Sequence, residues 1–188
     1  MFEYLQVIRE VVGDMPPLLP TFPMTVYYGN ERVFNGREFK ACDVDIAPRV
    51  FIGGGPSELY TLIMIDPDAP DPSDPCLKQV VSCVTMFIIC LLTLKQCVVF
   101  RIVINIRGGT SHSQGTEVVP YEASSPEVGI HRNIFVLYKQ QSQLDNIETL
   151  ASRFCFNIRA FATENNLGNP VRVTYFNMRQ TNKRKRGE

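Results

Sequence analysis

Short stretches of apolar residues, some alternating with polar ones, recur along the chain and are separated by Gly, Pro and Asn. This pattern is typical of β-strands that bury one or both faces in a core. Gly29 and Asn30 separate the first two stretches and predict a tight hairpin turn. The predicted strands cover residues 24–28, 32–34, 49–52, 59–65, 102–106, 134–138 and 171–176.

Two further stretches, residues 2–12 and 152–166, have the spacing of helices. In the second, Phe154, Ile158 and Phe161 recur every three or four residues, which places them on one helix face. A glycine and a proline follow shortly afterwards and end this helix. Because strands outnumber helices, the sequence predicts a mostly β fold, an antiparallel β-sandwich with peripheral helices.

A proline-rich segment, residues 66–75, directly follows the predicted strand 59–65. Each proline removes a backbone donor and fixes φ, so the segment cannot continue the strand. The sequence therefore predicts a rigid loop at a strand end. Loops held in this way often carry binding residues.

The chain has 188 residues, of which 45% are apolar, so it can bury one sizeable core. We predict a single domain over residues 1–179 and a basic tail, 180–188. Lys and Arg number 19, as do Asp and Glu, but four basic residues form the run 183–186. The domain is therefore mildly acidic, which argues against a direct nucleic-acid partner. The tail is either a solvated terminus or a nuclear-import signal.

The cysteines and the first residues indicate the compartment. None of the six cysteines forms a pair with the short spacing of a zinc knuckle, so we predict no metal site. Residues 1–13 contain Glu3, Arg9 and Glu10, unlike a signal peptide. We therefore expect reduced thiols and a cytoplasmic and nuclear location.

Two motifs resemble the signatures of the phosphatidylethanolamine-binding protein (PEBP) family. Residues 59–70, Leu-Tyr-Thr-Leu-Ile-Met-Ile-Asp-Pro-Asp-Ala-Pro, resemble the first, and residues 129–132, Gly-Ile-His-Arg, the core of the second. Residues 155–162, 167–171 and 175–177 are similar to the closing region of the plant members. Residues 102–110 most resemble the mother-of-FT branch of the flowering-locus-T and terminal-flower type. The resemblance implies a PEBP-like sandwich and a role in flowering, meristem fate or seed germination.

The resemblance also implies a pocket for a small anion or a phospholipid headgroup, formed by Asp66, Asp68, Pro70, Gly129 and His131. His131 can donate a hydrogen bond to an anionic oxygen, more strongly when protonated. A carboxylate at its other ring nitrogen would favour the imidazolium. We assign that role to Asp68, with Asp66 capping backbone donors of the loop. Gly129 would let the main chain approach a ligand. The plainer alternative is that both aspartates only hold the loop.

The chain departs from the family over residues 80–101. Relatives have a short Tyr/Trp-Leu/Val-His-Trp step there, whose histidine belongs to the pocket. This chain has 22 residues instead, and its only histidines are His112 and His131. Asn133 stands where animal relatives have a pocket tyrosine. Both changes are expected to weaken ligand binding, because they remove donors and a stacking wall.

Residues 80–94 are uncharged but shorter than a bilayer span of about 20 residues, so we expect no stable membrane insertion. A close-packed sandwich has no room for the whole segment 80–101. It must loop out or displace a strand. We interpret it as a translated intron fragment or an altered splice junction.

The resemblance implies complexes with 14-3-3 proteins and bZIP transcription factors. Florigen-type relatives contact 14-3-3 proteins through two arginines and a proline, and the corresponding positions here are Ser57, Arg107 and Gln143. Loss of both arginines removes charge-assisted contacts that can be hot spots. Binding to 14-3-3 proteins is therefore expected to be altered.

Catalysis is not predicted, and no cofactor is implied. Asp68, His131 and a serine such as Ser111 or Ser113 could form a triad, but the Gly-x-Ser-x-Gly elbow is absent. The main hypothesis is a non-enzymatic regulatory binding protein. The alternatives are phosphatidylethanolamine or phosphate-ligand binding as the main activity, and protease or kinase inhibition.

Overall fold

The computed structural model describes residues 22–69, 97–124, 126, 129–147, 150, 152–154 and 156–179. Within these ranges the strands are β1 (Met24–Tyr28), β2 (Glu31–Arg32), β3 (Arg37–Phe39), β4 (Arg49–Ile52), β5 (Leu59–Asp66), β6 (Val98–Arg107), β7 (Thr110–Ser111), β8 (Thr116–Val119), β9 (Ile130–Lys139) and β10 (Pro170–Arg179). The helices are the short 3-10 helices η1 (Ala41–Asp43) and η2 (His112–Gln114), and the α-helix α3 (Ile158–Glu164).

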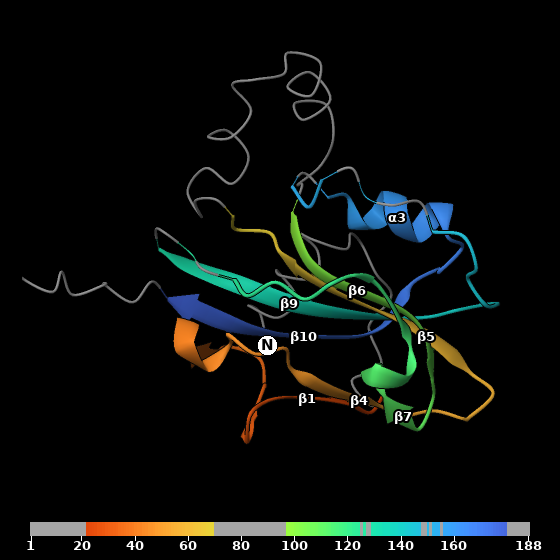
Figure 1. Cartoon of the computed structure of the whole chain (residues 1–188), viewed down its shortest axis with the longest axis horizontal. Coiled ribbons are helices and arrows are strands. Elements are labelled where there is room, and N and C mark those ends of the chain that lie inside the picture. The colour runs from red at the N-terminus through yellow and green to blue at the C-terminus, as the bar shows by residue number, and fades with distance from the viewer. Residues whose placement is uncertain are drawn as a thin grey trace, which may run out of the picture.

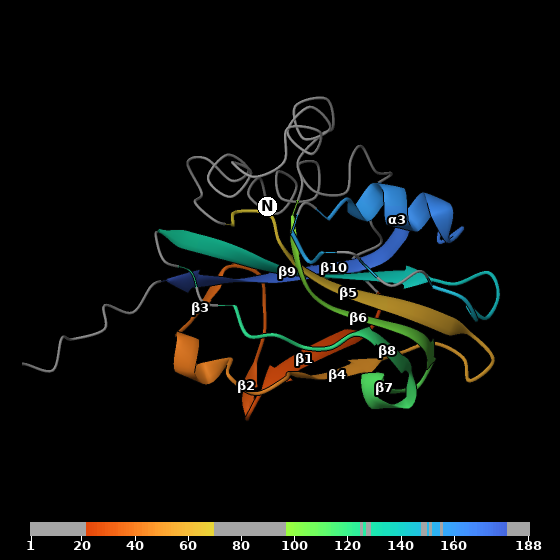
Figure 2. The ribbon, with the colours of Figure 1, turned by 45° about the horizontal axis from the view of Figure 1, so that its top comes forward.

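The strands form two sheets that pack face to face. The smaller sheet has the order β2-β1-β4-β7 and the larger the order β3-β10-β9-β5-β6-β8 (Figure 1). Helix α3 lies on the opposite face of the larger sheet, as Figure 2 shows most clearly. The predicted mostly β sandwich with a peripheral helix is confirmed. The sheets are antiparallel except where β3 runs parallel to β10.

Side chains along each strand of the larger sheet alternate between its two faces, so a hydrophobic core forms on each face. Along β5, Leu62 and Met64 point towards the smaller sheet, whereas Ile63 and Ile65 pack with the residues of α3. Both faces of β5 are thus covered, which explains its nearly unbroken apolar sequence. In β4, by contrast, alternate residues are exposed because the outer face of the smaller sheet is not covered by a described element.

The predicted strands are found, but several ends differ: β6 and β9 each begin four residues before the predicted strand, and β2 shares only Arg32 with the predicted strand 32–34. The hairpin at Gly29 and Asn30 is confirmed: Tyr28 pairs with Glu31, and Gly29 has φ +56°, a left-handed conformation that favours glycine. Strands β3, β7 and β8 were not predicted, because they have only two to four residues and are largely polar.

The predicted helix 152–166 begins too early. Helix α3 starts at Ile158, because the side chain of Asn157 accepts hydrogen bonds from the backbone of Arg159 and Ala160 and so caps the helix. Phe156 forms a β-bridge with Cys97 instead. The predicted helix 2–12 and the tail 180–188 lie outside the described residues.

The end of the segment predicted to be an insertion belongs to the fold. Residues 98–101 form the start of β6, where Val98 pairs with Asp66 and Val99 with Ile65. Phe100 is buried between the two sheets. Only residues 80–96 of the predicted insertion lie outside the described part of the chain. Among the described residues, no helix is long and apolar enough to cross a membrane.

A buried glutamine fixes the end of the sheet where β5 begins. The Oε1 atom of Gln140 accepts hydrogen bonds from the hydroxyl of Thr61 (3.0 Å) and the backbone of Asn105 (2.8 Å). Its Nε2 donates to Asn105 Oδ1 and to the carbonyl of Ser142. Asn105 has φ +56° and exchanges two hydrogen bonds with the backbone of Leu144. The network therefore holds the loop after β9 against β6.

We predict that Gln140→Leu lowers the free energy of unfolding by about 2 kcal/mol or more, because Thr61 and the Asn105 amide lose their buried partner. Denaturant unfolding checks this. The neighbouring Gln141 is exposed, so Gln141→Leu is the control and should have little effect. Equal stability of the two variants would contradict the role assigned to the network.

Candidate ligand-binding site

The candidate site lies where β5 ends and β9 begins. These strands are antiparallel and pair Ile65 with Ile134, so Asp66 comes close to the first residues of β9. The Nδ1 atom of His131 is 2.7 Å from Oδ2 of Asp66. Side-chain exposure is 2% for His131 and 1% for Asp66. The structure therefore brings Asp66 and His131 together in a pair that is shielded from solvent.

Asp68 takes a different role from the one predicted. Its carboxylate accepts hydrogen bonds from Nε and a terminal nitrogen of Arg132 at 2.8 and 2.7 Å, and from the Arg132 backbone at 2.8 Å. Its own backbone N–H donates to Oδ1 of Asp66. The prediction that Asp68 holds His131 is wrong, because Asp66 does so. The expected capping of a loop donor by Asp66 is present as well.

The alternation of side chains along β9 explains why Asp66, and not Asp68, contacts His131. His131 and Arg132 are neighbours on β9 and point to opposite faces of the sheet. Asp66 lies on the face that points towards the smaller sheet, as Met64 does, and meets His131. Asp68 lies beyond the strand end and reaches Arg132. Arg132 follows His131 in the motif, but it was not predicted as a site residue, because its contact with Asp68 depends on the pairing of β5 with β9.

The charges of this cluster nearly cancel. Burial raises the pKa of Asp66 above its ordinary value, and the hydrogen bond from His131 opposes this effect. The two aspartates and Arg132 sum to a charge of −1, and protonation of His131 would bring the sum to zero. The four side chains therefore provide no net positive charge, which disfavours a multiply charged anion.

The remaining predicted pocket residues are placed as follows. Gly129 directly precedes β9 and has φ +77°, a conformation that glycine adopts without strain. Pro70 lies outside the described residues. Within the described part of the chain, no group of three or more His, Cys, Asp or Glu side chains could hold a metal ion.

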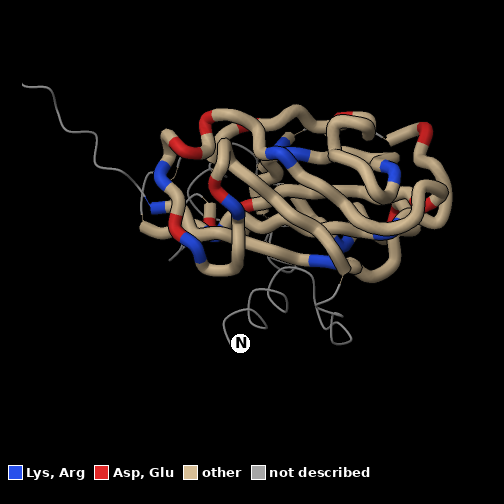
Figure 3. The backbone as a smooth tube through the Cα atoms, turned by 90° about the horizontal axis from the view of Figure 1, so that it is seen from below, with Lys and Arg blue, Asp and Glu red and all other residues tan. Residues whose placement is uncertain are grey.

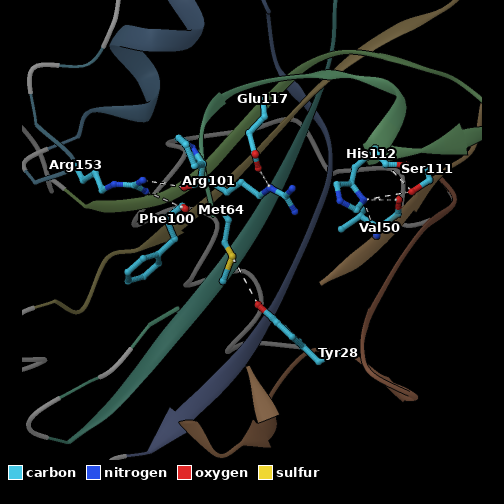
Figure 4. Close-up of polar contacts among 11 residues, drawn as sticks. Tyr28, Val50, Met64, Phe100, Arg101, Ser111, His112, Glu117 and Arg153 are labelled. Atoms are coloured by element: carbon cyan, nitrogen blue, oxygen red, sulfur yellow. Dashed lines mark hydrogen bonds and ion pairs between the residues drawn. The ribbon is translucent and has the colours of Figure 1, made fainter. Parts of the chain in front are cut away.

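The serines considered for a triad lie elsewhere. The Ser111 hydroxyl is 3.4 Å from Nδ1 of His112, which also contacts the backbone of Val50 (Figure 4). His131 is instead paired with Asp66. Figure 4 also shows Arg101, which forms an ion pair with Glu117 at 2.6 Å. None of these contacts joins a serine to the predicted pocket.

The three predicted partner residues gather at the opposite end of the same strands. Ser57, Arg107 and Gln143 are all exposed. Arg107 pairs with Leu59, which follows the loop that carries Ser57. The backbone N–H of Gln140, three residues before Gln143, donates to the carbonyl of the same Leu59. The eight residues of β5 separate this end from Asp66 by about 25 Å.

This opposite end also has a groove and an ion pair. A groove of about 420 Å³ is lined by Lys139, Gln140, Gln141, Leu167, Gly168 and Asn169. Lys139 forms an ion pair with Glu58 at 2.6 Å. Elsewhere on the described backbone, basic and acidic residues are interspersed (Figure 3).

The hydrogen bonds of Glu58 should make the stability of the fold depend on pH. Hydrogen bonds from Lys139, the Gly55 backbone and Tyr60 lower the pKa of Glu58 from 4.5 to about 2. Because the folded-state pKa lies below the unfolded one, this carboxylate stabilises the fold above pH 4.5, and the contribution is lost between 4.5 and about 2. We predict that Glu58→Gln melts at a lower temperature than the unaltered chain at pH 6. The two melting curves should converge near pH 2, and a constant difference would contradict the assignment.

The side-chain amide of Asn133, on β9 near this site, has no hydrogen bond within the described part of the chain. Its side chain is completely buried, and neither Oδ1 nor Nδ2 has a partner. An unsatisfied buried polar group costs about 1–3 kcal/mol. From the sequence, Asn133 is recognised only as a replacement of the tyrosine found in animal relatives. That its amide has no hydrogen bond can be recognised only from the structure.

We predict that Asn133→Leu, which has a similar branched shape, raises the free energy of unfolding by about 1–3 kcal/mol. The reason is that two polar atoms no longer need to be buried without partners. Thermal and denaturant unfolding measure the change. A less stable variant would show that the amide has a partner, such as a buried water.

Fold and motifs together define the class of the protein. The family model for phosphatidylethanolamine-binding proteins matches residues 29–176. The chain therefore belongs to the PEBP family.

Plant proteins are among the relatives of this chain. The chain is 40% identical to TERMINAL FLOWER 1 of Arabidopsis thaliana, over 96% of this chain and 93% of that protein. It is 38% identical to MOTHER of FT and TFL1 homolog 2 of Oryza sativa subsp. japonica, over 91% and 90%. These similarities support a regulatory role.

Solved structures share the fold at lower identity. The phosphatidylethanolamine-binding protein from Plasmodium vivax superposes with a TM-score of 0.70 at 19% identity, over 96% of both chains. A carboxypeptidase Y inhibitor, solved with its cognate proteinase, gives 0.73 at 18% identity, over 96% of this chain and 93% of the inhibitor. At these identities the likeness concerns the fold alone.

Proposed function

We propose that this chain is a non-enzymatic regulatory protein of the cytoplasm and nucleus, which modulates flowering, meristem or seed-germination programmes. It acts through complexes with 14-3-3 proteins and bZIP transcription factors. Family membership and the 40% identity to TERMINAL FLOWER 1 support the regulatory part. The observation that favours a partner surface is the exposure of Ser57, Arg107 and Gln143 at one end of the larger sheet.

Charge at this surface provides a test. Arg107 is the one cation among the three positions, so we predict that Arg107→Glu weakens binding to a purified 14-3-3 protein by about tenfold or more. Ser57→Arg combined with Gln143→Arg should strengthen it. Arg32 is exposed on the smaller sheet, and Arg32→Glu is the matched control. Affinities measured by calorimetry decide the matter, and equal affinities for Arg107→Glu and Arg32→Glu would reject this surface.

A second role, ligand binding at the Asp66–His131 end, is favoured by the buried polar cluster found there. Burying charged and polar side chains costs free energy even when they are paired. Four such residues, Asp66, Asp68, His131 and Arg132, meet at one strand end. We propose that they bind a phospholipid headgroup or a related phosphate ligand.

Asp66→Asn tests the ligand-binding role better than His131→Ala. Removing His131 leaves a buried carboxylate without its partner and costs about 3–5 kcal/mol, so that variant would unfold in part. Asn at position 66 can still bond to His131 and to the Asp68 backbone, but it no longer favours the imidazolium. We predict about tenfold weaker calorimetric binding of sn-glycero-3-phosphoethanolamine, a soluble headgroup. Glu58→Gln, at the far end of β5, should bind as the unaltered chain does.

A further inference from the structure

The outer face of the smaller sheet is open to solvent. The sheet has the order β2-β1-β4-β7 (Figure 1), and its inner face packs into the core between the sheets. Along β1 and β4 every second residue is buried, so the residues between them point outwards. Their register partners on β2 and β7 point the same way. The outward residues are Thr25, Tyr27, Arg32, Arg49, Phe51 and Ser111.

Two arginines flank an aromatic ring in one row of this face. Tyr27 pairs with Arg32 on β2 and with Arg49 on β4, so the three side chains lie next to one another across the sheet. Both arginines are exposed, and neither forms an ion pair within the described residues. Arg49 donates one hydrogen bond, to the carbonyl of Gly29 at 2.6 Å. A guanidinium has five N–H donors, so both arginines keep donors for a partner.

The outward positions of these four strands carry no acidic residue. The strands contain a single acid, Glu31, which forms an ion pair with Arg37. Its register partner Tyr28 points inwards, so Glu31 does not belong to the outward row. The acidic excess of the domain as a whole predicts no direct nucleic-acid partner, but that excess does not lie on this face. The face is locally positive and attracts phosphate groups.

A second row has an exposed aromatic ring at its centre. Phe51 is 48% exposed and pairs with Thr25 and Ser111, so a hydroxyl side chain lies on each side of it. It is a diagonal neighbour of Tyr27, because it lies two residues from the register partner of Tyr27. In the described part of the chain, neither ring packs against another aromatic ring. Both rings are therefore available for stacking.

We propose that this face binds single-stranded RNA. Exposed aromatic rings on an open sheet stack with nucleobases, and neighbouring arginines bind the phosphates. Tyr27 and Phe51 each stack with one base, while Arg32 and Arg49 bind the adjoining phosphates. The hydroxyl side chains beside Phe51 exchange hydrogen bonds with 2′-hydroxyl groups, which DNA lacks. A duplex does not fit this face, because its bases are already stacked and paired.

Two other anionic partners match the face less well. An acidic peptide offers carboxylates to the arginines but no flat rings for two neighbouring aromatic side chains. An anionic membrane offers phosphates, but interfacial binding requires a broad apolar face that enters the bilayer. Here Tyr27 is half-buried in a flat, paired sheet, and the other outward residues next to Phe51 are polar. Only a strand with both bases and phosphates uses the aromatic and the basic residues together.

The aromatic contact is tested with a fluorescein-labelled oligouridine and the full chain, by fluorescence anisotropy. The basic run 183–186 also attracts RNA, so every variant keeps it. Phe51→Leu retains an apolar side chain but no flat ring, and it should weaken binding about tenfold. Phe51→Tyr should bind as the unaltered chain does. Phe154→Leu is the matched control, because Phe154 is 51% exposed in the segment before α3.

The phosphate contacts are tested by salt. On a single strand, each phosphate contact contributes about −0.7 to the slope of log affinity against log salt concentration. Arg49→Gln should therefore make this slope shallower by about 0.7. Lys139→Gln removes the same charge at the far end of the larger sheet and should leave the slope unchanged. Unfolding curves for each variant show that the fold is retained.

The outcomes are distinct. Weaker binding by Phe51→Leu alone among the aromatic variants, with a shallower slope for Arg49→Gln, supports the proposal. Equal affinities of Phe51→Leu and the unaltered chain overturn it, because binding then comes from the basic run. Equal affinity for oligodeoxyuridine overturns the assignment to RNA. Displacement of the RNA by oligoglutamate or by phosphatidylglycerol vesicles of equal charge indicates an acidic peptide or a membrane instead. Absence of any binding by the unaltered chain also overturns the proposal.

Discussion

The antiparallel pairing of β5 with β9 is the constraint on which the rest of the structure depends. These strands are central in the six-stranded sheet and have both faces covered, so their register is fixed by two cores at once. A shift of one residue would move Leu62 and Met64 to the wrong core. The same register sets which residues meet at each end: Asp66 with His131 at one, and the loop after Lys139 with Leu59 at the other.

Two buried amides, those of Gln140 and Asn133, have contrasting surroundings. Near the start of β5, every hydrogen-bonding atom of the Gln140 amide has a partner, and the network holds a loop in place. A fully satisfied network of this kind makes a conformation rigid and specific. At the Asp66 end, paired charges lie next to the unsatisfied amide of Asn133. An unsatisfied buried group in a native structure is explained by strain, by a functional role or by a bound water or ion. The hydroxyl of Tyr138, near the Gln140 end, is also buried without a hydrogen bond within the described residues, so the contrast concerns the two amides alone.

Much of the fold follows from local sequence, whereas the site depends on contacts between distant residues. Residues 49–52 and 59–65 were predicted almost to the residue, because apolar runs bounded by Gly and Pro leave few alternatives. The helix was predicted to start too early because the helical spacing of apolar residues already includes Phe154. Asn157 caps the helix, which therefore begins after it. The motifs predicted Asp66 and His131 as site residues. Their contact depends on how side chains alternate between the faces of β5 and β9, because the two residues are 65 positions apart in the sequence. The unsatisfied state of Asn133 depends on every neighbour at once and has no local signature.

The two ends of the larger sheet are joined by rigid strands. A ligand changes a distant surface only when it binds two arrangements of the protein with different affinity. The elements that join the ends here are β5 and β9, which are fully paired and packed on both faces. Close-packed strands of this kind deform little. If a ligand binds at the Asp66 end, this rigid connection predicts that Ser57, Arg107 and Gln143 keep their positions.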